Sequence, residues 1–190
     1  MGGIFALKVC VYAICKNESQ FVDRFMDSMS EADYVCVLDT GSSDDTVKKL
    51  RARGAIVGET VVSPWRFDTA RNESLGLIPA DADICCAIDL DEQFHPGWRA
   101  ALERAWQPDT TRARYRYTWS FRPDGSEGMV FWADKIHKNG CYRWASPVHE
   151  TLAYTGEGAE RFVDAAGVQL DHHPDETKSR GQYLPLLELA

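Results

Sequence analysis

The sequence predicts an α/β fold with a mainly parallel central sheet and helices on both of its faces. Through about the first 107 residues, four short apolar runs alternate with four stretches of helical, 3.6-residue periodicity. Polar clusters follow three of the apolar runs, and the alternation stops after Pro108. Alternation of this kind is typical of parallel sheets, because a helix between two strands returns the chain to the same end of the sheet.

The elements of this first part can be placed from their apolar spacing and their capping residues. Strands are expected at residues 7–14, 34–38, 55–62 and 83–88. Helices are expected between them, with Asn17 capping the first and Ser42 to Asp45 capping the second. The third helix is expected to end before Pro79, and the fourth to begin near Pro96.

The pattern after Pro108 is different. Residues 113–121 and 128–136 read as two strands around the turn 122–125, and residues 143–150 read as irregular. A short strand is expected at 168–170, and a helix over 176–190. The apolar stripe of this helix runs to residue 190 without a cap or stop signal, so we expect the chain to be a fragment of a longer protein. The expected organisation is one domain, 1–190, with a first half to about 107 and a second half from about 108 to 175.

Composition excludes several classes of function. The chain has 190 residues, enough for one sizeable core, and a net charge of −8, which argues against a general grip on nucleic acid or anionic membranes. No apolar run reaches the length of a membrane span or a signal-peptide core. The six cysteines lack zinc-site spacing, and four lie in apolar strands, so we expect reduced packing thiols in a cytoplasmic protein.

The most informative segment is the acidic run 89–92, which follows the apolar strand 84–88. Asp89 and Asp91 fall on the same side of an extended chain. Two carboxylates this close repel each other unless a cation lies between them, and a hard divalent ion prefers oxygen ligands. The segment therefore predicts a metal site that a bound diphosphate would complete.

Two other polar clusters, 15–18 and 39–42, follow the first and second strands. In parallel α/β sheets, ligands bind beyond the carboxyl ends of the strands. Three polar strand ends at one edge of the sheet therefore indicate a ligand site there.

The order of these motifs resembles the family-2 glycosyltransferases of GT-A fold over about residues 8–173. The resemblance rests on the segments that follow: Cys15-Lys16-Asn17-Glu18, Leu38 to Thr46, Phe67 to Asn72, Asp89-Leu90-Asp91-Glu92, Trp144 to Glu150, and a later His. It implies transfer of a sugar, with inversion at the anomeric carbon, from a nucleotide donor that is most often a UDP-sugar. The first half would then bind the nucleotide-sugar, and the second half would form a smaller mixed region facing the acceptor.

The resemblance also implies roles for residues on the donor side. Asp91 would bind Mn²⁺ or Mg²⁺, and the neighbouring Asp89 and Leu90 would contact the nucleotide-sugar. Thr40 stands where the family usually has a second Asp, which leaves Asp39 as the main carboxylate facing the base or ribose. The remaining predicted nucleotide contacts are Cys15, Asn17, Glu18 and Arg71.

On the acceptor side, Glu150 lies where the family places its general base, and His149 could orient it or contact the acceptor. His172 would complete the metal shell, with His173 as the alternative ligand. Trp144 could stack on a sugar, although a buried core role is common for Trp. The acceptor itself stays open between a protein side chain, a glycan and a modified nucleic acid.

Two other functions are compatible with the pattern. A nucleotidyltransferase also combines an α/β sheet with metal-binding carboxylates, but it would normally show a Gly-rich basic loop after the first strand, and residues 15–18 have no Gly. A nucleotide-sugar-binding module without catalysis is the second alternative. Hydrolysis assays on nucleotide-sugars would separate the three.

Overall fold

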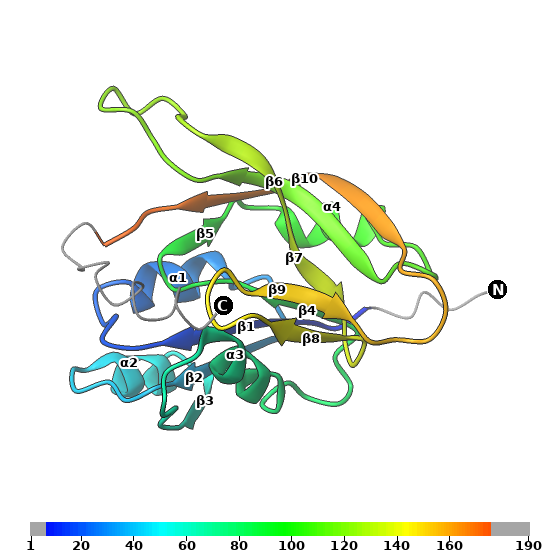
Figure 1. The fold of residues 1–190 in the computed structure, drawn as a ribbon. Helices are drawn as coiled ribbons and strands as arrows, with labels where there is room; N and C mark the ends of the chain where they lie inside the picture. The colour runs from blue at the N-terminus through cyan, green and yellow to red at the C-terminus, as the bar shows by residue number, and fades with distance from the viewer. Residues whose placement is uncertain (1–6, 176–190) are drawn as a thin grey trace.

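A computed structural model describes residues 7–175, which form the α/β fold predicted from the sequence (Figure 1). An eight-stranded sheet has the order β3-β2-β1-β4-β7-β6-β10-β5. The first four strands in this order are parallel to one another, and the other side of the sheet is mixed. The strands of this sheet are β1 (Val9–Cys15), β2 (Tyr34–Asp39), β3 (Ile56–Glu59), β4 (Ile84–Ala87), β5 (Glu92–Phe94), β6 (Arg112–Thr118), β7 (Val130–Lys138) and β10 (Phe162–His172).

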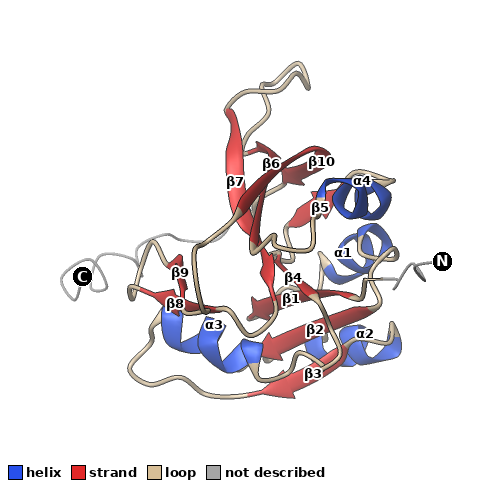
Figure 2. Cartoon of the chain, turned by 90° about the vertical axis from the view of Figure 1, so that its right-hand side faces the viewer, coloured by secondary structure: helices blue, strands red, loops and turns tan. Residues whose placement is uncertain are grey.

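Helices cover both faces of the sheet, as the alternation predicted (Figure 2). One face packs on three helices, and the other packs on one helix and on a two-stranded hairpin, β8–β9. The helices are α1 (Val22–Ser28), α2 (Thr46–Ala52), α3 (Phe67–Leu75) and α4 (Trp98–Ala105), and the hairpin strands are β8 (Tyr142–Ala145) and β9 (Thr151–Tyr154).

Strand β1 lies at the centre of the parallel part, and all seven of its residues are buried. Its side chains alternate between two cores, so Val9 and Val11 pack toward α1 while Cys10 and Tyr12 pack toward the hairpin β8–β9. This explains the continuous apolar sequence, because a parallel strand covered on both faces has no solvent side. Its central place fixes the carboxyl ends of β1, β2 and β4 along one edge.

Helix α4 shows how apolar spacing places a helix on the sheet. Trp98, Ala101 and Leu102 recur at helical spacing and are buried, while Ala100 and Glu103 on the other side of the helix are exposed. Trp98 stacks on Phe94 of β5 with ring centroids 4.4 Å apart. A buried side chain of this size contributes about 1.5–3 kcal/mol, so this stripe anchors the helix beside β5 and β10.

The sequence reading of the second half needs correction. The segment 143–150 is not wholly irregular, because β8 begins at Tyr142 and β9 follows at Thr151. The strand expected at 168–170 is eleven residues long, with a shift of register between Asp164 and Gln169 that interrupts its apolar pattern. The short β5 was also missed. The helix expected from 176 lies outside the described residues.

All six cysteines are free, and only Cys141 is not fully buried. The predicted packing role is confirmed for the four strand cysteines, Cys10, Cys36, Cys85 and Cys86, which are buried in the apolar cores. Within residues 7–175, no helix is long and apolar enough to cross a membrane.

Candidate active site

The acidic turn after β2 uses its carboxylate within its own loop. Asp39 Oδ1 accepts hydrogen bonds from the backbone N–H of Gly41 (2.9 Å) and Ser42 (2.8 Å), and Oδ2 accepts one from the Ser42 hydroxyl. The thiol of Cys15 lies 3.5 Å from Oδ2. Gly41 has φ 108°, a value that favours glycine, and lets the chain bend back toward the Asp39 side chain. Four hydrogen-bond contacts therefore surround a side chain that is almost fully buried.

The segment after β1 closes over this turn. Asn17 has φ 54°; its N–H donates to the Ser42 hydroxyl (2.8 Å), and its Oδ1 accepts from the N–H of Ser43 (2.7 Å). The N–H of Glu18 donates to Thr46 Oγ1 (2.8 Å). The expectation that Asn17 caps the first helix is wrong, because α1 begins only at Val22 and Asn17 bonds to the neighbouring loop instead. The predicted nucleotide contacts Cys15, Asn17, Glu18 and Asp39 are therefore brought together at one edge.

Arg71 of α3 joins two acidic segments that lie far apart in the sequence. Its Nη2 donates to Asp89 Oδ1 (2.8 Å), and its Nε donates to Glu150 Oε1 (2.9 Å). The Arg71 side chain is 4% exposed, against 32% for Asp89 and 14% for Glu150. Nη1 of Arg71 is buried and has no hydrogen-bond partner among the described residues. The guanidinium lies over the Trp144 ring, 5.1 Å from its centroid.

The carboxylate of Asp89 also faces Lys135 of β7, with Nζ 3.8 Å from Oδ2. Burial opposes the charge on Asp89, but Arg71 and Lys135 outweigh it and lower its pKa to about 2. Burial likewise opposes the charge on Lys135, but Glu92 and Asp89 raise its pKa. Asp89 is therefore a carboxylate held between two cations.

Glu92 lies beneath this cluster and is 2% exposed. It accepts hydrogen bonds from the N–H of Asp89 (2.8 Å) and from the hydroxyl of Tyr117 (2.6 Å). Burial raises the pKa of Glu92, and the nearby charge of Asp89 adds to this. These bonds fix the backbone of the segment 89–92. The side chain of Leu90 is fully buried in the core, so only its backbone could meet a ligand.

Strand β10 ends beside Asp91 and brings His172 to it. His172 Nε2 lies 3.3 Å from Asp91 Oδ2, and its Nδ1 lies 3.0 Å from the backbone oxygen of Trp119. The Trp119 ring stacks on the imidazole with centroids 4.5 Å apart. Burial lowers the pKa of His172, but the hydrogen bond and charge of Asp91 outweigh it and raise the pKa. His173 turns away and stacks on Phe121.

The pair Asp91 and His172 fits a divalent ion whose remaining coordination positions are filled by a bound ligand. Nδ1 bonded to the Trp119 oxygen directs Nε2 toward Asp91, as in many metal-binding histidines. No set of three His, Cys, Asp or Glu side chains in residues 7–175 could hold a metal by itself. Asp91 and His172 would therefore hold an ion together with oxygen atoms of a bound diphosphate or water.

The predicted acceptor-side residues lie on the loop between β8 and β9. Glu150 Oε1 is held by Arg71, and His149 is exposed with φ 53°. Trp144 is buried, and its Nε1 donates to the hydroxyl of Tyr12 (3.0 Å), which confirms the core role for this Trp. The Asn72 side-chain amide of α3 donates to the backbone oxygen of Trp144 and accepts from its backbone N–H. These two bonds fix β8 against α3.

The sequence reading missed three members of the site. Glu92 was quoted in the motif but given no role, and Lys135 and Tyr117 lie in strands that were read only as alternating patterns. Their signal is weak, because each depends on pairing across β4, β6 and β7.

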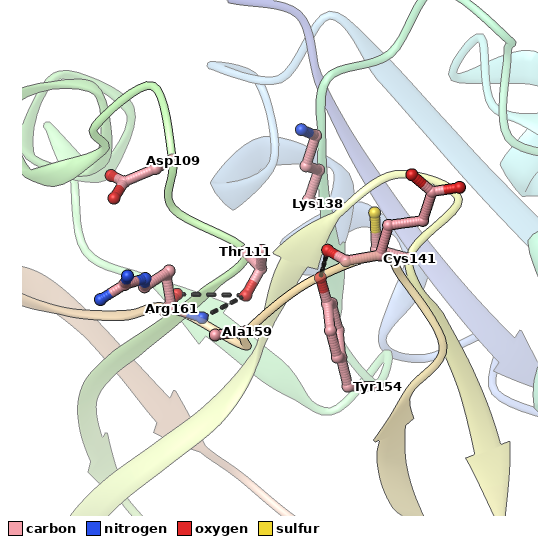
Figure 3. A pocket seen from close by; sticks show the side chains of 8 residues that line it. Asp109, Thr111, Lys138, Cys141, Tyr154, Ala159 and Arg161 are labelled. Atoms are coloured by element: carbon pink, nitrogen blue, oxygen red, sulfur yellow. Dashed lines mark hydrogen bonds between the residues drawn. The ribbon is translucent and has the colours of Figure 1, made fainter.

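A separate cavity of about 430 Å³ lies at the opposite end of β10, near the start of that strand (Figure 3). Thr111 exchanges hydrogen bonds with the backbone of Arg161 at its wall, and the Tyr154 hydroxyl donates to the Glu157 oxygen. None of the predicted site residues lines it.

The fold of this chain is similar to those of several proteins of known structure. No family model matches the chain. A mycobacterial protein of known crystal structure has a TM-score of 0.59 at 16% identity, over 90% of this chain and 69% of that one. Glucosyl-3-phosphoglycerate synthase from Mycobacterium tuberculosis, solved with Mn²⁺, UDP and phosphoglyceric acid, gives 0.49 at 26% identity, over 59% of this chain. Mannosyl-3-phosphoglycerate synthase from Rubrobacter xylanophilus gives 0.49 at 19% identity, also over 59%.

The chain spans 44% of the length of the Mycobacterium tuberculosis synthase and 40% of the Rubrobacter enzyme. The likeness to the mycobacterial protein covers nearly the whole chain at low identity, so it supports the fold alone. The fold is α/β and Rossmann-like, with the candidate site at the carboxyl ends of its parallel strands.

Proposed function

We propose that this chain is a metal-dependent, inverting glycosyltransferase that takes a sugar from a nucleoside-diphosphate donor, with UDP as the preferred nucleotide. The observation that carries this proposal is the meeting of Asp91 with His172 beside the Arg71-linked pair Asp89 and Glu150. Asp91 and His172 would supply part of a metal shell, Arg71 is a buried cation, and Glu150 is a carboxylate beside it. All of them lie at the edge where α/β sheets bind nucleotides. The motifs that resemble the family-2 glycosyltransferases lie at the same edge.

In this proposal Asp91 and His172 hold Mn²⁺ or Mg²⁺, which when bound neutralises charge on the departing diphosphate. The loop that the side chains of Asn17 and Asp39 hold in shape binds the base and ribose. Arg71 orients Asp89 toward the donor and Glu150 toward the acceptor through separate nitrogens.

Glu150 acts as the general base in this scheme. Its Oε1 is fixed by Arg71, which leaves Oε2 to take the proton of the acceptor hydroxyl. The hydroxyl oxygen then forms a bond to the anomeric carbon while the bond to the diphosphate oxygen breaks. Attack opposite the leaving group inverts the anomeric centre.

The test is a melting-temperature measurement with UDP, in the presence of Mn²⁺ or of a chelator. We expect stabilisation by UDP that needs Mn²⁺, and its loss in Asp91→Ala. The matched control is Asp45→Ala, an exposed carboxylate 3.8 Å from Lys48, which should keep the response. Equal stabilisation with and without metal, or a retained metal response in Asp91→Ala, would contradict the proposal.

A screen of nucleotide-sugars under the same conditions identifies the donor, and product analysis separates the three functions considered. Release of UDP with a glycosylated product supports transfer. Release of diphosphate from UTP and a sugar 1-phosphate, supplied in a separate assay, would indicate a nucleotidyltransferase, and binding without turnover a non-catalytic module.

A further inference from the structure

Three polar side chains are buried together next to the candidate site. They are Tyr12 of β1, His137 of β7 and Trp144 of β8, and we call them the buried polar cluster. The Tyr12 hydroxyl lies 2.8 Å from His137 Nε2 and 3.0 Å from Trp144 Nε1. Among residues 7–175, the polar side-chain atoms of the cluster bond only to one another and to one backbone oxygen. The core around Tyr12 and Trp144 is otherwise mainly apolar.

The hydrogen bonds of the buried polar cluster allow a single arrangement of protons. An indole N–H can only donate, so the Tyr12 oxygen accepts from Trp144 and the Tyr12 O–H donates to His137 Nε2. The imidazole proton is then on Nδ1, which donates to the backbone oxygen of Lys138 at 3.1 Å. Burial lowers the pKa of His137 to about 4, so the neutral imidazole that this arrangement requires is present at pH 7. The cluster therefore selects one orientation of the Trp144 ring.

The Trp144 ring packs against the buried cation of the candidate site, with the Arg71 guanidinium carbon 5.1 Å from the ring centroid. Hydrogen bonds hold two edges of the guanidinium, from Nε to Glu150 (2.9 Å) and from Nη2 to Asp89 (2.8 Å). Nη1 has no hydrogen-bond partner among the described residues. Arginine planes pack on aromatic faces because the cation is attracted to the ring. The ring therefore helps to set the plane of a guanidinium that hydrogen bonds leave free on one edge.

We infer that the buried polar cluster positions Arg71 and, through it, the proposed base Glu150. This inference rests on the proposed function and adds three positioning residues to it, all of them too deeply buried to touch a substrate. A core role alone would be served by apolar side chains of similar size. The polar groups instead restrict the Trp144 ring, and the ring restricts the guanidinium that binds Glu150 Oε1.

Tyr12→Phe tests the cluster by removing a single oxygen atom. It leaves the Trp144 N–H and His137 Nε2 without their shared partner but keeps the ring that fills the core. We expect single-turnover transfer at saturating donor and acceptor to fall by about tenfold, since a misplaced catalytic group can cost about 10²-fold in rate. The affinity for UDP with Mn²⁺, measured by titration, should change by less than about twofold, because Asp91 and His172 bond to other elements.

Tyr142→Phe is the matched control. Tyr142 lies on the same strand as Trp144 and in the same core, and its buried hydroxyl also makes two hydrogen bonds, to Thr111 Oγ1 (3.1 Å) and Glu160 Oε1 (2.9 Å). Both substitutions should lower the melting temperature, but only Tyr12→Phe should slow transfer by the folded protein. Equal transfer rates in the two variants would show that the cluster serves the core alone and would overturn the inference.

Two substitutions of His137 separate hydrogen bonding from shape. His137→Gln supplies a side-chain oxygen that can accept from the Tyr12 O–H, whereas His137→Phe fills similar space without an acceptor. Transfer should be about fivefold faster in His137→Gln than in His137→Phe, the equivalent of one typical hydrogen bond. Equal rates in these two variants would mean that the acceptor is not needed and would contradict the inference.

Urea denaturation tests the link to Arg71 without turnover. The effects of Tyr12→Phe and Arg71→Met on the unfolding equilibrium constant should be non-additive by at least about twofold, because both break the same row of contacts. Additive effects would show that the cluster does not reach Arg71. Normal transfer by Tyr12→Phe beside an active wild type defeats this inference alone, whereas a wild type that transfers no sugar from any nucleotide-sugar defeats the proposed function.

Discussion

Two acidic segments follow buried strands at the same edge of the sheet and use their carboxylates differently. The carboxylate oxygens of Asp39 accept hydrogen bonds from donors in its own loop and from the neighbouring Cys15. The segment 89–92 takes its partners from α3, β6, β7 and β10. The first segment is a local turn, whereas the second is a junction between the two halves of the chain. A carboxylate at a strand end can therefore stabilise its own turn or join distant parts of the fold. Which of the two it does depends on whether its partners come from its own loop or from other elements.

The largest expected effect is on catalysis at the junction. Glu150→Gln keeps the acceptor atom for Arg71 but cannot take a proton, so transfer should fall by about 10²–10⁴-fold. Single-turnover transfer and the melting temperature are measured on one preparation, with the exposed Glu157→Gln as control. A stable Glu150→Gln protein with near-normal transfer would remove Glu150 as the base.

The next effect concerns the cation that joins the two halves. Arg71→Met leaves Glu150 without its cation and Asp89 with only the more distant Lys135, which should lower the free energy of unfolding by about 3 kcal/mol. Arg51→Met removes an exposed pair with Glu59 and should cost less than about 1 kcal/mol. Both are measured by urea denaturation. Equal costs would mean that the junction is no more cohesive than a surface pair.

The contribution of Asp89 to the free energy of unfolding should depend on pH, which tests the buried cluster further. Its folded pKa of about 2 lies below the unfolded value of 3.8, so its contribution is present above the unfolded pKa and is lost as pH falls toward 2. At pH 7 Asp89→Asn should therefore cost about 1–2 kcal/mol, since the side chain is partly exposed. The difference between wild type and variant, followed by urea denaturation, should shrink between pH 5 and pH 3. A difference that does not change with pH would show that the cost is not electrostatic.

The smallest effect is expected at the turn. Asp39→Asn keeps one oxygen for the two backbone N–H groups, so it should cost about 1 kcal/mol. Because the carboxylate is already surrounded by donors, UDP affinity of the folded variant should fall by less than about fivefold. Titration with UDP and Mn²⁺ measures this. A much larger loss would assign Asp39 a direct nucleotide contact, as the family resemblance implies.

The fold of the first half could be predicted because each strand and helix carries its own apolar period. The exception in the first half is β5, which has only three residues. In the second half the pair β6–β7 could be predicted, but the register shift in β10 breaks the apolar pattern of that strand. The site divides in the same way. Asp89, Asp91 and Arg71 could be predicted from motifs and strand ends, whereas Lys135 and Tyr117 enter only through pairing between distant strands.

The position of β10 has a consequence for how the protein gains its site during synthesis. This strand lies between β6 and β5 and supplies His172, although Asp91 is made far earlier. A domain generally folds as a unit, and the acidic segment is synthesised well before the histidine that faces it in the finished sheet. Without β10, β5 has no strand to pair with, and Asp91 lacks His172 as its neighbour. The strand that completes the sheet is therefore also the one that completes the pair Asp91–His172.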